Sequence, residues 1–190
     1  TVAHDGKLDL LINNAGMSAK GTVEEGDLDV FRKIVEINLL GSTYTTKFAL
    51  PHLRKSKGSM MLISSLAGIH GLPYFASYST SKKALGALAE SLRVELHGAN
   101  VHVGIAYVGF TETDEEKTFY NAKGELEYLP KRENVKATPL EVTAEKVIRQ
   151  IQKRKKSSYH STIGNLNRIM YRVYPPIVEF FLKKSLSKFK

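Results

Sequence analysis

Cysteine is absent from this 190-residue chain, and so are long apolar runs. Without cysteine the chain can form neither disulfide bonds nor thiolate metal sites, and we predict no metal centre. No stretch of about 18 consecutive apolar residues occurs, so we expect no helix that crosses a bilayer. The sequence shows no secretory signal, internal repeat or low-complexity tract, which indicates a single folded domain in the cytoplasm.

Acidic side chains are scarce in the last third of the chain. The net charge is +9, yet residues 121–190 carry 16 Lys and Arg against 6 Asp and Glu, while residues 1–120 carry 12 against 13. Such asymmetry is typical of proteins with an acidic partner, such as nucleic acid, anionic lipid or a phosphorylated ligand. A solvated basic face is the simpler interpretation. We predict no nucleic-acid binding, because few aromatic residues accompany the basic ones.

The sequence does contain short apolar runs that alternate with longer helical patterns. The apolar runs predict strands at 8–12, 59–64, 101–108 and 158–163. Helical periodicity predicts helices at 27–54, with Asp27 as N-cap, at 74–97 and at 142–153. Strands and helices that alternate at this length predict parallel βαβ units. We therefore expect an α/β fold whose parallel sheet is covered on both faces.

Two further segments do not follow this alternation. Residues 110–138 are polar and contain Gly124 and Pro130, which predicts a long loop with a short helix. The tail at 166–190 is predicted to be helical with a break at Pro175-Pro176.

A tyrosine and a lysine at helical spacing are the first candidates for chemistry. Tyr78 and Lys82 stand four residues apart near the start of a predicted helix, so their side chains share one face. An ammonium group beside a phenol favours the phenolate and lowers the tyrosine pKa from about 10. Such a phenol can act as a general acid or base near neutral pH. The spacing alone is common in ordinary amphipathic helices.

Three other polar features support a functional interpretation of Tyr78 and Lys82. Ser65 lies 13 residues before Tyr78, at the end of a predicted strand, and ligands of open parallel sheets bind beyond the carboxyl ends of the strands. Asn38 stands within a helix among apolar neighbours, where asparagine is disfavoured. Asn-Asn-Ala-Gly at 13–16 follows a strand directly, and Gly16 permits close approach of the backbone to a ligand.

Together these motifs resemble the short-chain dehydrogenase/reductase family. The matching text is Asn-Asn-Ala-Gly at 13–16, Asn38 within Glu-Ile-Asn-Leu, Ile-Ser-Ser at 63–65 and Tyr-Ser-Thr-Ser-Lys at 78–82. The resemblance implies a doubly wound, Rossmann-like sheet and a nicotinamide-dependent oxidoreductase. NADP is the preferred cofactor prediction and NAD the alternative. The tail is similar to extensions of the hydroxysteroid-dehydrogenase-like branch.

The resemblance also implies a role for each matching residue. Tyr78 would exchange a proton with the substrate oxygen, Lys82 would lower its pKa and bind the nicotinamide ribose, and Ser65 would polarise the carbonyl. Asn38 would hold a relay water through its main chain. The remaining positions implied to contact the cofactor are Asn14, Ala15, Gly16, Gly109 and Thr113.

Two departures from the family pattern are visible. Val108 stands where the family usually has proline before Gly109, which changes the loop but removes no catalytic group. Nothing like the family's Gly-rich phosphate-binding turn precedes Leu8. The resemblance therefore implies that residues 1–165 are the C-terminal two-thirds of one domain, without its first βαβαβ portion, and that 166–190 is a helical tail.

The loop at 110–138 is predicted to cover the substrate. Phe75, Tyr107 and Phe110, together with Ser65, are candidate walls of the pocket, and aromatic walls suit a steroid-, retinoid- or lipid-like carbonyl or alcohol. A 3-oxoacyl carrier-protein reductase and a non-catalytic module that kept the fold are the alternatives.

The surface of the molecule suggests two kinds of partner. The family habit implies a homodimer or homotetramer built on the helices at 27–54 and 74–97. The apolar and lysine-rich segment 176–190 suits either docking on protein or a peripheral membrane contact.

Overall fold

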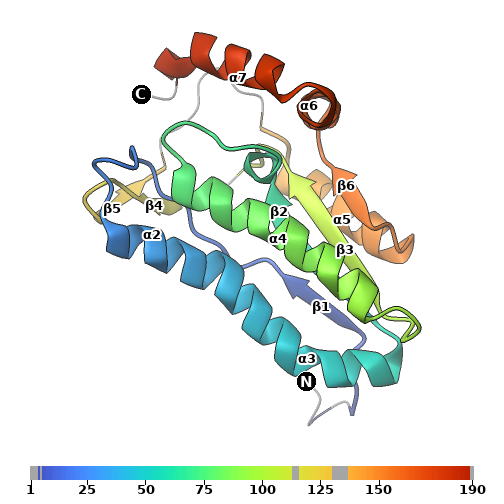
Figure 1. Ribbon diagram of the computed structural model, residues 1–190. Helices are drawn as coiled ribbons and strands as arrows, with labels where there is room; N and C mark the ends of the chain where they lie inside the picture. The colour runs from blue at the N-terminus through green and yellow to red at the C-terminus, as the bar shows by residue number, and fades with distance from the viewer. Residues whose placement is uncertain (1–3, 5, 113–115, 130–136, 189–190) are drawn as a thin grey trace.

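Four parallel strands form the central sheet of the computed structural model, which describes residues 4, 6–112, 116–129 and 137–188 (Figure 1). Their order in the sheet is β1-β2-β3-β6. The strands are β1 (Leu10–Asn13), β2 (Ser59–Ser65), β3 (His102–Val108) and β6 (Ser157–Tyr159). The predicted parallel α/β fold is confirmed, although the last strand is shorter than the predicted 158–163 and begins one residue earlier.

Helices cover both faces of this sheet. On one face lie α2 (Leu28–Val35), α3 (Gly41–Ser56) and α4 (Ala76–Glu95), and on the other lies α5 (Leu140–Gln152) (Figure 1). Asp27 is the N-cap of α2, as predicted, because its side chain accepts a hydrogen bond from the amide of Asp29. The predicted helix at 27–54 is not a single α-helix, since a π-helical turn (Glu36–Leu40) joins α2 to α3.

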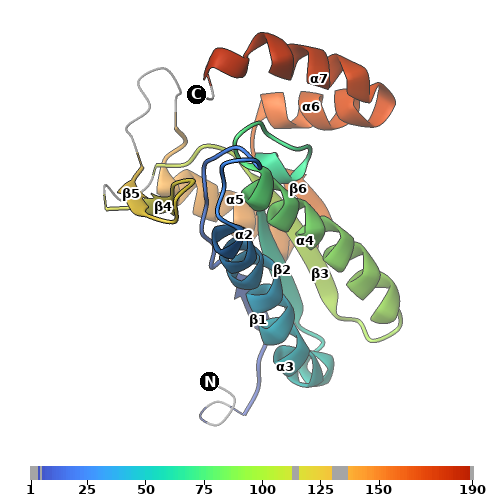
Figure 2. The same ribbon diagram turned by 60° about the vertical axis from the view of Figure 1, so that its left-hand side comes forward.

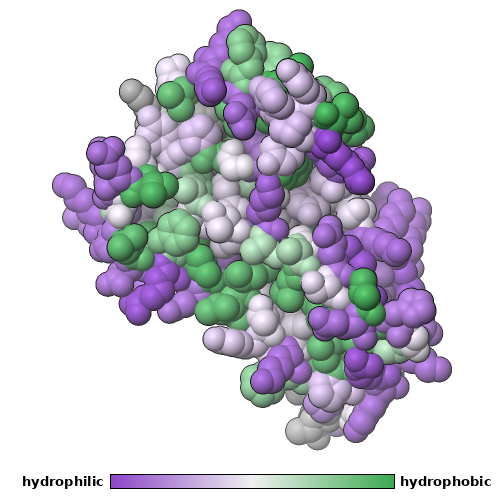
Figure 3. Space-filling view, in the orientation of Figure 1, coloured by the Kyte–Doolittle hydropathy of each residue, from purple (hydrophilic) through white to green (hydrophobic). Residues whose placement is uncertain are grey.

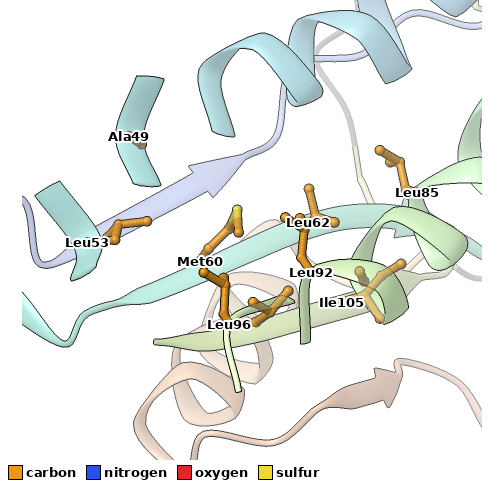
Figure 4. Close-up of a cluster of buried hydrophobic side chains, with 10 residues drawn as sticks. Ala49, Leu53, Met60, Leu62, Leu85, Leu92, Leu96 and Ile105 are labelled. Carbon is orange, nitrogen blue, oxygen red and sulfur yellow. The ribbon is translucent and has the colours of Figure 1, made fainter. Parts of the chain in front are cut away.

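Strand β2 shows why its sequence carries no polar alternation. Met60 and Leu62 pack with Leu53 of α3 and Leu92 of α4 in the main core (Figure 4), whereas Met61 faces the opposite side, in a smaller cluster with Val147 of α5. The two methionines and Leu62 are fully buried. A strand with both faces covered favours a continuous apolar run, here Met60–Ile63, over alternation.

The segment 110–138 differs from its prediction. In place of a short helix, the structure places an antiparallel hairpin of β4 (Thr118–Tyr120) and β5 (Leu126–Tyr128) there. Asn121 closes the turn by accepting hydrogen bonds from the amides of Lys123 and Glu125, and Gly124 supplies a φ of 84°. The hairpin packs on the segment after β1, through hydrogen bonds from the amide of Lys20 to Tyr120 and from the amide of Tyr120 to Ser18.

The chain ends in a helical pair beyond the carboxyl ends of the strands, α6 (Thr162–Val173) and α7 (Pro175–Lys184), followed by a 3-10 turn (Leu186–Lys188) (Figure 2). The predicted break at Pro175-Pro176 is confirmed, because both prolines open α7. Apolar side chains stay exposed on this pair, among them Leu166, Val173 and Phe180, and apolar surface is visible at the top of Figure 3. No described helix is long and apolar enough to cross a membrane.

Candidate functional site

The carboxyl edge of the sheet gathers most of the candidate residues. Ser65 ends β2 opposite Val108 of β3, so Gly109 leaves the sheet next to Ser65. The loop Asn14–Gly16 leaves the neighbouring strand β1, which is paired with β2. Helix α4 begins at this same edge and carries Tyr78 and Lys82 in its first two turns.

Asn38 is the centre of the hydrogen-bond network that joins these segments. Its side chain is completely buried. The Oδ1 atom accepts from the amide of Met17 at 2.8 Å, and Nδ2 donates to the carbonyl of Met17 at 2.9 Å and to Oγ of Ser81 at 2.9 Å. The Ser81 hydroxyl then donates to the carbonyl of Tyr78 at 2.8 Å. Asn38 therefore fixes the loop after β1 against the first turns of α4.

The π-helical turn explains why asparagine can occupy this place in a helix. Asn38 lies at the middle of the turn, and its own carbonyl accepts a hydrogen bond from the Ser42 hydroxyl at 2.9 Å. A π-helical turn displaces one residue from the regular helical spacing, and such turns occur often at functional sites. The sequence indicated that Asn38 was unusual, but its side-chain partners lie 21 and 43 residues away along the chain.

Lys82 lies buried under the same loop. Its ammonium donates to the carbonyl of Ile63 at 3.0 Å and lies 6.0 Å from the centre of the Tyr78 ring. Burial, with a smaller contribution from the charge of Lys117, lowers the pKa of Lys82 to about 8. Lys117 precedes the hairpin strand β4, and sequence reasoning did not single it out.

Gly16 is required by how closely this loop packs. A Cβ atom at position 16 would lie 2.9 Å from Nζ of Lys82 and 3.2 Å from Oδ1 of Asn38. Asn14, Ala15 and Gly16 are all exposed, so their outer side is open to a ligand while their inner side touches the lysine and the asparagine.

We expect the substitution Gly16→Ala to lower kcat of the intact protein by about 10²-fold, because displacement of a reacting group by about 1 Å can cost that much. The matched control is Gly71→Ala, since a Cβ atom at that position meets nothing within 4 Å. Steady-state kinetics of both variants would decide. Equal rates for the two would show that the contact with Lys82 is irrelevant to turnover.

Ser65 combines a local structural role with a hydroxyl donor for which no described residue is an assigned acceptor. Its Oγ accepts a hydrogen bond from the amide of Ala67 at 3.2 Å and so caps the 3-10 turn (Leu66–Gly68). The side chain is half-buried, and within the described part of the chain its hydroxyl hydrogen has no assigned acceptor. It can therefore donate to an oxygen atom of a ligand at the sheet edge.

A comparison of the sequence with models of known protein families identifies one family. The model of the short chain dehydrogenase family matches residues 1–124. The chain belongs to the short-chain dehydrogenase family. The motifs that carried the resemblance, from Asn13 to Lys82, all fall within the matched part.

Curated relatives of the chain include proteins named as a dehydrogenase and a reductase. The chain is 43% identical over 129 residues to "11-beta-hydroxysteroid dehydrogenase A" of Arachis hypogaea, which covers 67% of this chain and 37% of that protein. It is 41% identical over 118 residues to "3-dehydrosphinganine reductase" of Danio rerio, which covers 60% of this chain and 36% of that protein. The matched part thus spans little more than a third of either relative.

Solved structures of short-chain dehydrogenases share the fold. A short-chain dehydrogenase from Streptomyces avermitilis superimposes with a TM-score of 0.78 at 21% identity, over 98% of this chain and 71% of that one. A short chain dehydrogenase from Burkholderia cenocepacia in complex with NADP gives a TM-score of 0.80 at 20% identity, over 95% and 71% of the two chains.

The remaining predicted site residues lie in different surroundings. Tyr107 stacks on Tyr159 at 4.7 Å between ring centres, and its hydroxyl lies against Gly86 of α4, so the ring belongs to the packing between sheet and helix. Burial raises the pKa of Tyr107 to about 12. Phe75 precedes α4, and Phe110 is half exposed after β3. The prediction for Thr113 lies outside the described residues.

Ser81 belongs to this network, although the resemblance implied no role for it. Ser81 is fully buried and links Asn38 to the backbone of Tyr78. A small hydroxyl residue between the tyrosine and the lysine was the available signal for it. Its partner on another helix could not be read from the local sequence.

Proposed function

We propose that the protein is a nicotinamide-dependent oxidoreductase that interconverts a hydrophobic carbonyl compound and its alcohol. The supporting observation is the network through Asn38, which holds the exposed loop after β1 and the first turns of α4 in one unit. A protein that only binds has no need for a buried lysine, a tyrosine and a serine at the edge of that unit.

The residues of the chain divide the reduction of a carbonyl between them. The Ser65 hydroxyl donates a hydrogen bond to the carbonyl oxygen and polarises it. The Tyr78 hydroxyl gives a proton to the same oxygen, and the charge of Lys82 beside the ring stabilises the phenolate that remains. A nicotinamide cofactor, when bound, would supply the hydride. In alcohol oxidation the Tyr78 oxygen receives the proton instead.

The residues present fit such a cofactor. The exposed loop Asn14–Gly16 offers backbone and a glycine where a side chain would collide, and Lys82 lies directly beneath it. We propose that this loop, Lys82 and Gly109 hold the nicotinamide nucleotide. NADP is preferred over NAD, an assignment supported by the NADP complex of the Burkholderia cenocepacia structure, which shares the fold.

A hydrophobic substrate is supported by two observations. The names of the Arachis hypogaea and Danio rerio relatives refer to a hydroxysteroid and a dehydrosphinganine, both of which are lipids. Phe110 is exposed next to Gly109, where an apolar compound could cover it. We therefore propose a steroid- or sphingoid-like carbonyl over a carrier-protein thioester.

The proposal for the assembly rests on exposed apolar residues of the outer helices. Leu28, Tyr44, Phe48 and Val94 of α2, α3 and α4 are each more than half exposed. Such residues suit a homodimer or homotetramer built on these helices. The exposed apolar side chains of α7 support either a contact between copies or a peripheral membrane contact of 176–190.

The cofactor assignment is tested by fluorescence titration of the intact protein with NADPH and with NADH. We expect saturable binding and a lower Kd for NADPH. The substitution Lys82→Met should raise that Kd by about 10-fold or more, the value of a hydrogen bond to a charged group. The matched control is Lys83→Met, because the exposed Lys83 contacts Tyr171 of the tail. Binding of neither nucleotide would contradict the proposal.

A further inference from the structure

An open groove lies at the far edge of the sheet, away from β1. It has a volume of about 440 Å³ and runs between α5, the strand β6 and the start of α6. Ligand sites for small molecules have volumes of about 300–1,000 Å³, so the groove is large enough for one. It shares no residue with the site around Tyr78 and Lys82.

Cations dominate the lining of this groove. Lys146 and Arg149 lie on α5 and Lys153 is its C-cap, so the three follow one another at helical spacing. Lys155 adds a fourth cation before β6. No acidic residue is among those that line it. Arg149 pairs with the exposed Glu145 at 3.2 Å, whereas the three lysines form no ion pair with any described residue. Among the described residues, the positive charge of these three lysines is therefore not neutralised by an ion pair.

The first turn of α6 adds neutral polar groups to the same place. Ser161 caps this 12-residue helix by accepting from the amide of Gly164 at 2.8 Å, and Thr162 and Asn165 stand at the rim. The positive end of the helix dipole therefore meets the lysines in the groove, which increases its attraction for an anion.

His160 lines the groove, and one of its two ring nitrogens has no hydrogen-bond partner among the described residues. Gln150 donates to the carbonyls of Ile105 and Lys155, which turns its oxygen toward the Ser158 hydroxyl. Because that hydroxyl donates to Gln150, it must accept from Nε2 of His160, 3.0 Å away. Nδ1 of His160 is then the buried atom that lacks a partner among the described residues.

The charge around His160 opposes a second proton on its ring. Burial and the charge of Lys146 lower the pKa of His160 below its usual value. The other charged or titratable groups that line the groove with it are Arg149 of α5, Lys153 at the C-cap of α5, Lys155, and Tyr159 of β6. An anion in the groove would offset these positive charges and let Nδ1 carry a proton.

We propose that this groove binds a phosphate monoester through Lys146, Lys153 and Lys155, with the start of α6 as the fourth contact. The phosphate group carries the charge and the acceptor oxygens that suit a helix terminus and three ammonium groups without an ion pair to any described residue. The same chemistry occurs in a soluble phosphorylated compound and in a lipid headgroup. Ile163, exposed beside Thr162, is compatible with either source.

The test uses two probes and two charge-matched variants of the intact protein. Glycerol 3-phosphate in calorimetry probes the soluble source, and flotation with phosphatidylcholine vesicles, with and without phosphatidic acid, probes the lipid source. The groove variant is Lys146→Gln/Lys153→Gln/Lys155→Gln. The control variant is Lys47→Gln/Lys55→Gln/Lys123→Gln, which removes the same charge from exposed positions elsewhere.

We expect the groove variant to raise the Kd for one of the two probes by about 10-fold or more, and the control variant by less than about twofold. The probe that responds identifies the source. In the NMR spectrum the ring signals of His160 should shift on saturation, while those of His52 on α3 should stay unchanged. Equal losses in both variants, or binding without a response of His160, would overturn the proposal, as would a preference for an oligonucleotide over both probes.

Discussion

Turnover of the intact protein should fall by about 10²- to 10⁴-fold when Tyr78 is replaced by phenylalanine, because positioned proton transfer contributes about this much to a rate. The substitution removes one oxygen atom from a half-buried side chain and leaves the hydrogen bond between Ser81 and the Tyr78 carbonyl in place. Oxidation of NADPH or NADH in the presence of a steroid ketone measures the rate. The Kd of the nucleotide should change little.

The matched control for this variant is Tyr44→Phe. Tyr44 is a tyrosine of α3, 56% exposed and outside the network around Asn38. Its loss of a hydroxyl should leave kcat within about twofold of the wild type, as expected for a surface substitution. If Tyr78→Phe retained full turnover, proton transfer would have to come from another group. If the wild-type protein also lacked turnover but bound nucleotide, the non-catalytic module would be the better description.

The free energy of unfolding should fall by about 3 kcal/mol when Asn38 is replaced by alanine, since a buried donor or acceptor left without a partner costs about 1–3 kcal/mol. The variant leaves the amide and the carbonyl of Met17 unpaired and opens a cavity inside a fully buried position. Urea denaturation followed by circular dichroism measures the change.

Asn14→Ala is the control for that experiment, because Asn14 lies in the loop that Asn38 holds but is exposed. Its free energy of unfolding should stay within about 0.5 kcal/mol of the wild type. A loss below about 1 kcal/mol for Asn38→Ala would mean that water replaces the side chain, and the network would then not be what orders the loop.

The sequence predicted the order of strands and helices well because apolar runs and helical periodicity are both local patterns. Runs such as Met60–Ile63 have the length and apolar content of buried strands, and each core strand of the sheet was placed within two residues of its observed start. The hairpin at 118–128 was missed because the polar composition of the whole loop outweighed a local signal. That signal was Thr-Phe-Tyr before Asn121 and Gly124, a typical strand and turn sequence.

Side-chain partners were the part that the sequence could not supply. Asn38 was recognised as unusual, and its implied role was to hold a water through the main chain. The structure adds a second role, in which its side chain pairs with Met17 and Ser81 on two distant segments. Tyr107 was predicted as a wall of the substrate pocket, and the structure adds that its ring stacks on Tyr159 and its hydroxyl lies against Gly86 of α4. Such orientations depend on tertiary packing.

The basic groove illustrates the same division. Composition showed an excess of positive charge in residues 121–190. In the structure Lys146 and Arg149 lie on α5, and Lys153 is the C-cap of that helix. The groove exists only because β6 and the start of α6 lie beside that helix, so that the cations line one side of it. The charge could be counted from the sequence, but its concentration in one place could not.

The π-helical turn at Glu36–Leu40 makes the site sensitive to the number of residues in the chain as well as to their kinds. A π turn is equivalent to one residue inserted into an α-helix. Deletion of a single residue there would let α2 and α3 run on as one regular helix, and the residues of the turn itself would lose their displaced positions. Asn38 would then turn away from Met17 even though no contact residue had been substituted. In this segment, gain or loss of a residue during evolution should be tolerated less than exchange of one residue for another.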